Sequence, residues 1–255
     1  MSDQLIDAPD VSDAAPAPRR RRRAPRQDWR LGGRTVRRWD VVVLAVALVS
    51  VGLGIVGGGL LSRVDAPWAP IASSLTLWVG FAVAIGFAFA RSRPIGLLRF
   101  RPVDVLFGVG VGLALRGMQG AVAGVAPFPT AGMLDSSLPA SWWLTDALPA
   151  VLVAPVLEEF LFRGVLLVVV YQLLRRAAGS LAAGFAALLV STGAFILVHA
   201  IGGTLSVADA VVFGAVGLTC GLLVLLTGRV WGAVLTHVVF NAAYVVLMVV
   251  GTALS

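Results

Sequence analysis

The stretch TDALPAVLVAPVLEEFLFRGVLLVVV, residues 145–170, indicates the fold of the whole chain. It is long and mostly apolar, and a helix that crosses a lipid bilayer needs about 20 apolar residues. Near its middle it nevertheless carries two adjacent carboxylates and an arginine, Glu158, Glu159 and Arg163. This combination predicts a transmembrane helix with polar groups enclosed at its centre.

Six other apolar stretches of the chain have a similar length. Hydrophobic residues make up 58% of the 255-residue chain and charged residues 13%, whereas a soluble domain has about 45–50% and about 25%. The composition excludes an ordinary soluble domain and predicts an all-α, polytopic transmembrane helical bundle over residues 39–255. The predicted spans, about seven in number, are 40–62, 70–90, 103–126, 145–170, 181–201, 209–227 and 230–252.

The basic residues indicate the orientation of the bundle. All 20 are arginines, ten of them between Arg19 and Arg38, and the net charge is +7. With a cytoplasmic N-terminus, 17 arginines fall on the inner side and only Arg63 falls on the outer side, as positive residues prefer. Residues 1–38 are polar and rich in proline, which predicts a disordered, Arg-rich cytoplasmic arm. We expect the arm to contact the bilayer rather than nucleic acid, in a multi-pass plasma-membrane protein. Arginine without lysine is typical of a GC-rich bacterial genome.

Small residues recur at helical spacing inside the predicted spans. Glycines four residues apart lie on one helix face and let neighbouring backbones approach closely. The pairs are Gly108 with Gly112, Gly120 with Gly124, and Gly217 with Gly221.

The ionisable residues within the spans indicate chemistry. Each costs at least about 2.5–3.5 kcal/mol in hydrocarbon, so these side chains should face the bundle interior. Glu159 and Arg163 are four residues apart and can pair on one helix face. Glu158 points about 100° away from Glu159 and is the freer carboxylate, which suits a general base.

The only two glutamates and the only two histidines of the chain all lie in predicted spans. His199 is near the end of the fifth span, and His237 lies in the seventh, four residues before Asn241. His237 and Asn241 therefore share a helix face, from which both can donate hydrogen bonds to a developing oxyanion. Straight helices would place His199 about 27 Å and His237 about 10 Å from the inner face. One shared site therefore requires tilted helices or shifted boundaries.

Three ordered motifs resemble a known family. They are EExxxR at Glu158, Glu159 and Arg163, FxxxH at Phe195 and His199, and HxxxN at His237 and Asn241. Together they resemble the CPBP family, the CAAX prenyl endopeptidases and bacteriocin-processing proteins, also called type II CAAX or ABI proteins. The resemblance covers about residues 140–250, which would form the catalytic core.

The resemblance implies an all-α membrane bundle with a water-filled cavity and intramembrane endopeptidase activity. It implies that Glu158 and His199 bind and activate the hydrolytic water, and that His237 and Asn241 stabilise the tetrahedral oxyanion. Glu159 and Arg163 would orient these groups, and Phe195 would be a packing residue. The implied partner is a peptide or protein substrate at or in the membrane.

The need for a metal stays open in the sequence. Zn²⁺ usually takes three protein ligands at a catalytic site, which Glu158, His199 and His237 could supply. We prefer a reaction without a cofactor, because there is no HExxH helix and because Glu159, the remaining base, is expected to pair with Arg163.

Two other functions fit the same residues. A proton-coupled transporter could use Glu158, His199 and His237 as a relay. A non-catalytic immunity or regulatory protein could keep the scaffold without the reaction. Arg116, in the third span near Gln119, could neutralise an acid, line a water path, contact a substrate carboxylate, or simply pair or snorkel.

Overall fold

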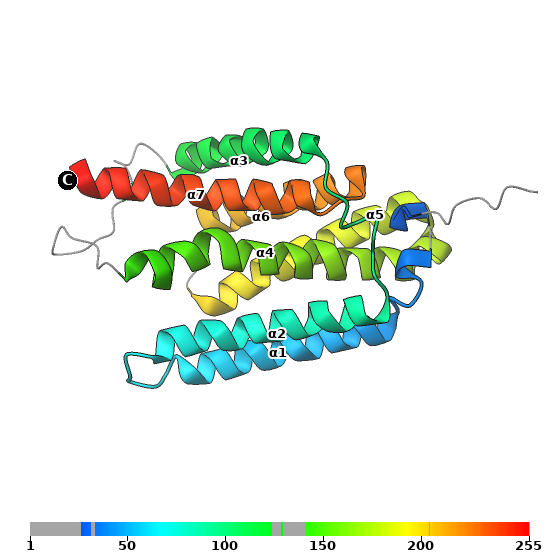
Figure 1. Cartoon of the computed structure of the whole chain (residues 1–255), viewed down its shortest axis with the longest axis horizontal. Helices are drawn as coiled ribbons and strands as arrows, with labels where there is room; N and C mark the ends of the chain where they lie inside the picture. Colours follow the sequence, from blue (N-terminus) through cyan, green and yellow to red (C-terminus); the bar gives the residue numbers. More distant parts are fainter. Residues whose placement is uncertain (1–26, 32–33, 124–128, 130–140, 204, 255) are drawn as a thin grey trace, which may run out of the picture.

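The computed structural model describes residues 27–31, 34–123, 129, 141–203 and 205–254, and the regular secondary structure in these ranges is helical. Within them, six helices are long and apolar enough to cross a membrane. Figure 1 shows the helices side by side in one elongated bundle. The predicted all-α transmembrane fold is confirmed. The main elements are α1 (Val41–Leu61), α2 (Ala69–Arg91), α3 (Pro102–Ala123), a long helical segment (Trp143–Ile201), α6 (Val207–Thr227) and α7 (Trp231–Leu254).

The long segment contains both the fourth and the fifth predicted span. It comprises η4 (Trp143–Ala147), η5 (Pro149–Val153), α4 (Ala154–Glu159), η6 (Phe160–Leu166) and α5 (Leu167–Gly202). Inside α5, Gly179 has φ 79° and ψ 169°, a backbone conformation that interrupts the helix and that glycine tolerates best. The Ser191 hydroxyl donates to the Phe162 carbonyl at 2.9 Å, so the chain reverses and forms two arms. The predicted spans 145–170 and 181–201 are these arms.

The two-armed segment lies at the centre of the bundle. The arm that contains α4 packs against α2 on one side and against α7 on the other. In Figure 1 the α1–α2 pair forms the lower layer, and α3, α7 and α6 form the upper one. Residues of the central arm therefore contact both outer layers.

Glycine spacing explains how the outer layers pack. A Cβ at Gly108 or Gly112 would lie 2.4 Å from Leu235 Cβ or 2.8 Å from the Thr236 carbonyl oxygen, so α3 approaches α7 closely along this face. A Cβ at Gly80 of α2 would likewise lie 2.5 Å from the Ser50 carbonyl oxygen of α1. The predicted role of these small residues in helix packing is confirmed for α3, whereas Gly120 has open space around it and Gly124 lies outside the described residues.

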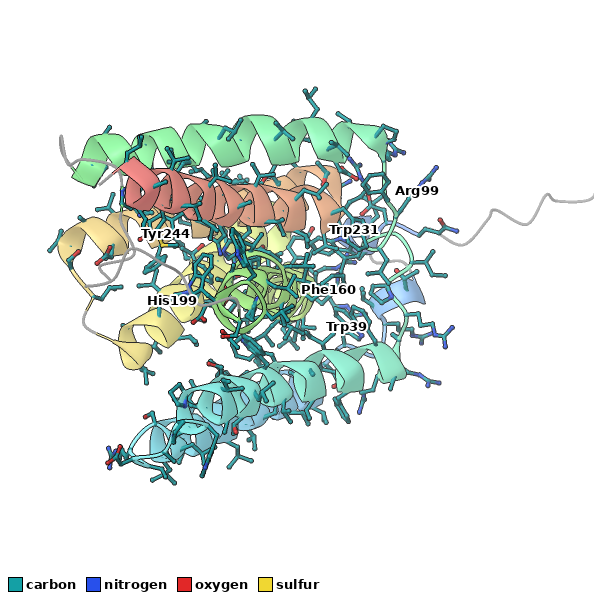
Figure 2. All side chains as sticks on the ribbon, turned by 60° about the vertical axis from the view of Figure 1, so that its left-hand side comes forward. Trp39, Arg99, Phe160, His199, Trp231 and Tyr244 are labelled. Atoms are coloured by element: carbon teal, nitrogen blue, oxygen red, sulfur yellow. The ribbon has the colours of Figure 1, made fainter. Side chains whose placement is uncertain are left out.

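A row of aromatic rings crosses the layers at one end of the bundle. Trp39 stacks on Phe89, which contacts Phe160 at 6.1 Å between ring centroids, and Phe160 contacts Trp231 at 5.8 Å. Figure 2 shows Trp39, Phe160 and Trp231 one above another in this row. Since Phe160 follows Glu159 directly, the row holds the central arm in place next to its carboxylates.

The end of the predicted disordered arm differs from the expectation. Residues 1–26 lie outside the described residues, but two short helical turns, η2 (Trp29–Leu31) and η3 (Arg34–Val36), precede α1. Trp29 is fully buried, and its indole N–H donates to the Gly228 carbonyl at 3.0 Å. Gln172 donates to the Trp29 carbonyl at 2.8 Å. The amphipathic tryptophan thus overrides the polar composition around it and docks the segment onto the bundle.

Arginines from distant parts of the chain gather at this same end. Arg91 pairs with Asp40 at 2.9 Å, and Arg175 donates to the Arg30 carbonyl at 3.0 Å. The arginine-rich connections that the sequence analysis assigned to one side of the membrane therefore lie at one end of the bundle.

Candidate active site

The EExxxR motif lies in a stretch of unusual helix geometry. Glu158 and Glu159 end α4, which is flanked by the π-helical segments η5 and η6. Single π-helical turns are rare and often occur at functional sites, because a wider turn redirects side chains and releases backbone carbonyls. Two such carbonyls have side-chain donors here: that of Ala150 accepts from Asn241, and that of Phe162 accepts from Ser191.

Glu159 and Arg163 form the predicted pair. Both side chains are fully buried, and Arg163 Nη1 lies 3.2 Å from Glu159 Oε1. The guanidinium also lies over the Phe195 ring, 4.5 Å from its centroid. Gly217 of α6 makes room for it, since a Cβ there would lie 3.3 Å from Arg163 Nη2.

The His237 ring lies between the carboxylates of Glu158 and Glu159. Its Nδ1 lies 3.0 Å from Glu159 Oε1, and its Nε2 lies 3.9 Å from Glu158 Oε2. The Glu158 side chain is 14% exposed, whereas that of Glu159 has no exposed surface. The structure thus agrees with the expectation that Glu158 is the freer carboxylate. Sequence spacing had no means of showing that His237, 78 residues away, is the partner of Glu159.

His199 occupies a neighbouring position. Its Nδ1 lies 2.8 Å from the Phe195 carbonyl oxygen, and its ring packs against Phe195 and Phe213, each at 4.5 Å between centroids. The Phe195 ring also contacts His237 at 5.7 Å. Both histidines therefore share Phe195 as a neighbour, and Phe195 is the buried packing residue that the family resemblance implies.

This shared neighbour closes the axial gap that straight helices predict between His199 and His237. Figure 1 shows α5 reversing beyond the turn that joins α6 to α7, and its second arm then crosses the bundle obliquely. This course brings Phe195 of the second arm into contact with the His237 ring of α7.

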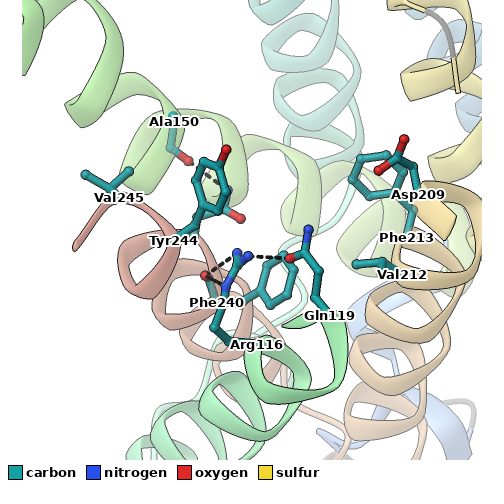
Figure 3. Close-up of a pocket in the computed structure, with 10 residues that line it drawn as sticks. Arg116, Gln119, Ala150, Asp209, Val212, Phe213, Phe240, Tyr244 and Val245 are labelled. Atoms are coloured by element: carbon teal, nitrogen blue, oxygen red, sulfur yellow. Dashed lines mark hydrogen bonds between the residues drawn. The ribbon is translucent and has the colours of Figure 1, made fainter. Parts of the chain in front are cut away.

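Asn241 lies one turn after His237 and borders a cavity. Its Nδ2 donates to the Ala150 carbonyl at 2.8 Å. The cavity has a volume of about 210 Å³, and Figure 3 shows its lining. The sequence analysis missed several of these lining residues: Tyr244 lies seven residues after His237 on the same helix face, a spacing that could have indicated it, whereas Phe213 carries no such signal. The lining comprises Arg116, Gln119, Ala150, Asp209, Val212, Phe213, Phe240, Asn241, Tyr244 and Val245.

The alternative zinc set does not gather as a ligand cluster. In the part of the chain that the structure describes, no group of three or more His, Cys, Asp or Glu side chains is arranged to hold a metal ion. The Nδ1 atoms of His199 and His237 are both engaged, by a backbone carbonyl and by Glu159. These contacts leave Nε2 of each ring available, as in histidines that bind a metal through Nε2 while Nδ1 donates to a carboxylate or carbonyl, so the choice between zinc and a metal-free reaction is a question for experiment.

The fold and this cluster define a polytopic membrane protein with carboxylate and imidazole groups enclosed in a helical bundle. A comparison with protein families matches residues 140–243 to the type II CAAX prenyl endopeptidase Rce1-like family. This match supports membership of the CPBP family of CAAX-protease-like intramembrane endopeptidases. The searches of curated proteins and of solved structures found no match. The matched segment spans η4 to the middle of α7 and includes all six predicted site residues, Glu158, Glu159, Arg163, His199, His237 and Asn241.

Proposed function

We propose that this chain hydrolyses a peptide bond of a membrane-associated substrate, with Glu158 as the general base. The observation that carries the proposal is the position of Glu158, partly exposed and 3.9 Å from a histidine that Glu159 holds in place. A carboxylate inside a membrane helix is costly unless it has a function. The family match supports peptide hydrolysis over proton transport, and a transporter more often shows repeated halves.

The contacts of the cluster support a division of roles. Glu159 pairs with Arg163 and accepts from the Nδ1–H of His237 at 3.0 Å. The other ring nitrogen of His237, Nε2, lies 3.9 Å from Glu158. In the proposed reaction this Nε2 carries a proton and donates, and Glu158 is the base.

The reaction then follows from these groups. Glu158 takes a proton from water as the water oxygen attacks the carbonyl carbon of the substrate. The oxyanion accepts hydrogen bonds from His237 Nε2–H and from the Asn241 N–H that Ala150 does not use. When the C–N bond breaks, the proton on Glu158 passes to the leaving amine. No step requires a metal.

His199 is suited to orient the water. A carbonyl oxygen only accepts, so His199 Nδ1 carries the proton that bonds to Phe195, and Nε2 of the neutral ring is free to accept. An imidazole nitrogen with a free lone pair can accept a hydrogen bond from the attacking water.

The test is cleavage of a randomised peptide library by the full-length chain in detergent. We expect Glu158→Gln to lower turnover by about 10²- to 10⁴-fold, the usual contribution of a general base. His237→Ala and Asn241→Ala should each lower it by about 10²- to 10³-fold. Asp65→Asn, which changes an exposed carboxylate between α1 and α2, should have no effect.

Three results would count against the proposal or its metal-free reaction. Full turnover by correctly folded Glu158→Gln would remove the assigned base, and a non-catalytic scaffold predicts that no variant cleaves at all, the wild type included. Turnover that a chelator abolishes and Zn²⁺ restores would favour the zinc alternative. Size-exclusion profiles of each variant provide the control for folding.

A further inference from the structure

Arg116 is a cation within the α3 span that lines the cavity beside Asn241. Its Nε and Nη2 donate to the Phe240 carbonyl at 3.1 and 2.7 Å, and its Nη1 donates to Gln119. The guanidinium lies 4.0 Å from the Phe240 ring centroid and 4.9 Å from that of Tyr244. Figure 3 shows Arg116 between these residues at the edge of the cavity. The geometry holds the guanidinium rigidly in one orientation.

This positive charge has no counter-ion within the residues that the structure describes. No carboxylate in the described ranges lies within ion-pairing distance of Arg116, unlike Arg163 and Arg229, which each have one. Asp209 also lines the cavity, but its carboxylate accepts from the Ser206 hydroxyl at 2.6 Å and from the Ser206 N–H at 3.2 Å, capping α6. Arg116 has five N–H donors, and three are used. Two remain, one on each terminal nitrogen, for an anion.

The cavity is adjacent to the proposed reaction centre. The carbonyl that Arg116 contacts belongs to Phe240, which directly precedes Asn241 and lies three residues after His237. Three residues of helix rise about 4.5 Å, and an extended peptide advances about 3.3 Å per residue. Phe213, another lining residue, packs against His199. The offset along the helix alone thus corresponds to about one or two residues of an extended peptide, and an anion at Arg116 would lie close to the bond that is cleaved.

We infer that the cavity binds a carboxylate of the substrate close to the scissile bond and that Arg116 determines this specificity. The inference rests on the proposed function and names its substrate class. The carboxylate can be the C-terminus of the peptide or an acidic side chain, since a guanidinium binds both in the same way. Tyr244 and Phe240 flank the guanidinium and limit its access to water, which strengthens its interaction with an anion.

The experiment measures binding separately from turnover. Peptides of a randomised library are selected by binding to the full-length Glu158→Gln chain in detergent, so that selection does not depend on cleavage. Each selected peptide is then remade in three forms: the free acid, the C-terminal amide, and the free acid with Asp and Glu replaced by Asn and Gln. Binding is measured by fluorescence anisotropy with and without Arg116→Gln, Arg116→Lys or Arg63→Gln.

Removing the recognised carboxylate should weaken binding by about 10- to 100-fold, the range for a lost hydrogen bond to a charged group. Arg116→Gln should abolish the preference for the peptide form that carries the carboxylate, and Arg116→Lys should retain part of that preference. Arg63→Gln removes an exposed arginine in the loop after α1 and should leave the preference intact. If the amide loses affinity, the recognised carboxylate is the C-terminus. If the form with Asn and Gln loses affinity, the recognised carboxylate is a side chain.

Two outcomes would overturn the inference. In one, neither neutral form loses affinity; in the other, Arg116→Gln weakens all three forms equally, as a purely structural role would. The proposed function fails on a different result, because peptides that bind the Glu158→Gln chain with the expected preference but are never cleaved by the wild type would leave the carboxylate site intact and remove the reaction.

Discussion

Two buried carboxylate–arginine pairs of this protein differ in how completely they are satisfied. Arg229 donates to Asp104 from Nε at 3.1 and 3.2 Å and from Nη2 at 2.6 Å, and Asp104 also accepts the Arg101 N–H at 2.8 Å. Glu159 and Arg163, in contrast, meet at a single distance of 3.2 Å. Their remaining atoms, Glu159 Oε2 and the guanidinium nitrogens, lack hydrogen bonds of good geometry among the described residues.

In the proposed reaction, this difference distinguishes a structural pair from a functional one. The Asp104–Arg229 pair uses nearly all its hydrogen-bonding capacity to tie the start of α3 to the turn between α6 and α7. The Glu159–Arg163 pair shares its carboxylate with His237, a group that can gain or lose a proton. Buried polar groups are usually satisfied, so the incompletely satisfied pair is the one that we assign to the proposed reaction.

The largest expected effect tests the structural pair. Asp104→Ala should lower the free energy of unfolding by about 3–5 kcal/mol, because it leaves Arg229 buried without a partner. Denaturation in detergent measures this change. The double variant Asp104→Leu with Arg229→Met should recover most of the loss, and Asp40→Asn, in the exposed pair with Arg91, should cost less than about 1 kcal/mol. Turnover per folded molecule should stay within about twofold of wild type in all three, and a larger fall in Asp104→Ala would contradict the structural assignment.

The next effect tests the functional pair. Glu159→Gln keeps the shape of the side chain but removes the charged acceptor that orients His237. We expect turnover per folded molecule to fall by at least about 10²-fold. The measurement is peptide cleavage normalised to the monodisperse fraction on size exclusion. Unchanged normalised turnover would show that Glu159, like Asp104, has a purely structural role.

A smaller effect tests how closely α6 encloses Arg163. Gly217→Ala would bring a Cβ to 2.8 Å from Thr192 Cγ2, so we expect a loss of about 1–3 kcal/mol in stability. Gly214→Ala is the matched control on the same helix, because the nearest atom to its Cβ, Ile196 Cδ1, lies at 3.8 Å. Thermal unfolding of the two variants measures the difference. Equal stability would show that the helices are less tightly packed at Gly217 than the distances indicate.

The smallest effect concerns a third, partly exposed pair. Hydrogen bonding to Arg30 at 2.7 Å holds the pKa of Asp28 below its usual value, despite an opposing contribution from burial. A lowered pKa stabilises the folded state above the unfolded pKa of about 3.9, and this contribution disappears as the pH falls through the folded value. Asp28→Asn should therefore lower the free energy of unfolding by less than about 1 kcal/mol near pH 7, and it should have no effect at a pH below the folded pKa of Asp28. Unfolding midpoints of the wild type and of Asp28→Asn, measured from pH 7 downward, give the difference in stability. A stability difference that grows as the pH falls would contradict the pairing.

Part of the site could be predicted from local spacing. Glu159 and Arg163 are one helical turn apart, so their pairing depends only on the helix that contains them. The contact of His237 with Glu159 depends on the offset between α7 and the central arm, and no local rule sets that offset. The burial of Trp29 was missed for a related reason: its surroundings are polar in sequence, and the hydrophobic contacts that bury it come from distant helices.

The sequence by itself determined that the chain forms apolar helices of membrane-spanning length, because a backbone in lipid has to satisfy its own hydrogen bonds. It also determined which few side chains are too polar for lipid and therefore face inward. Only the tertiary structure decided that His237 lies beside both carboxylates and that His199 shares the Phe195 ring with it. It also decided that Arg116 faces a cavity with no carboxylate partner among the described residues. Those positions depend on how helices cross and how far they are offset, and both result from side-chain packing over the whole bundle.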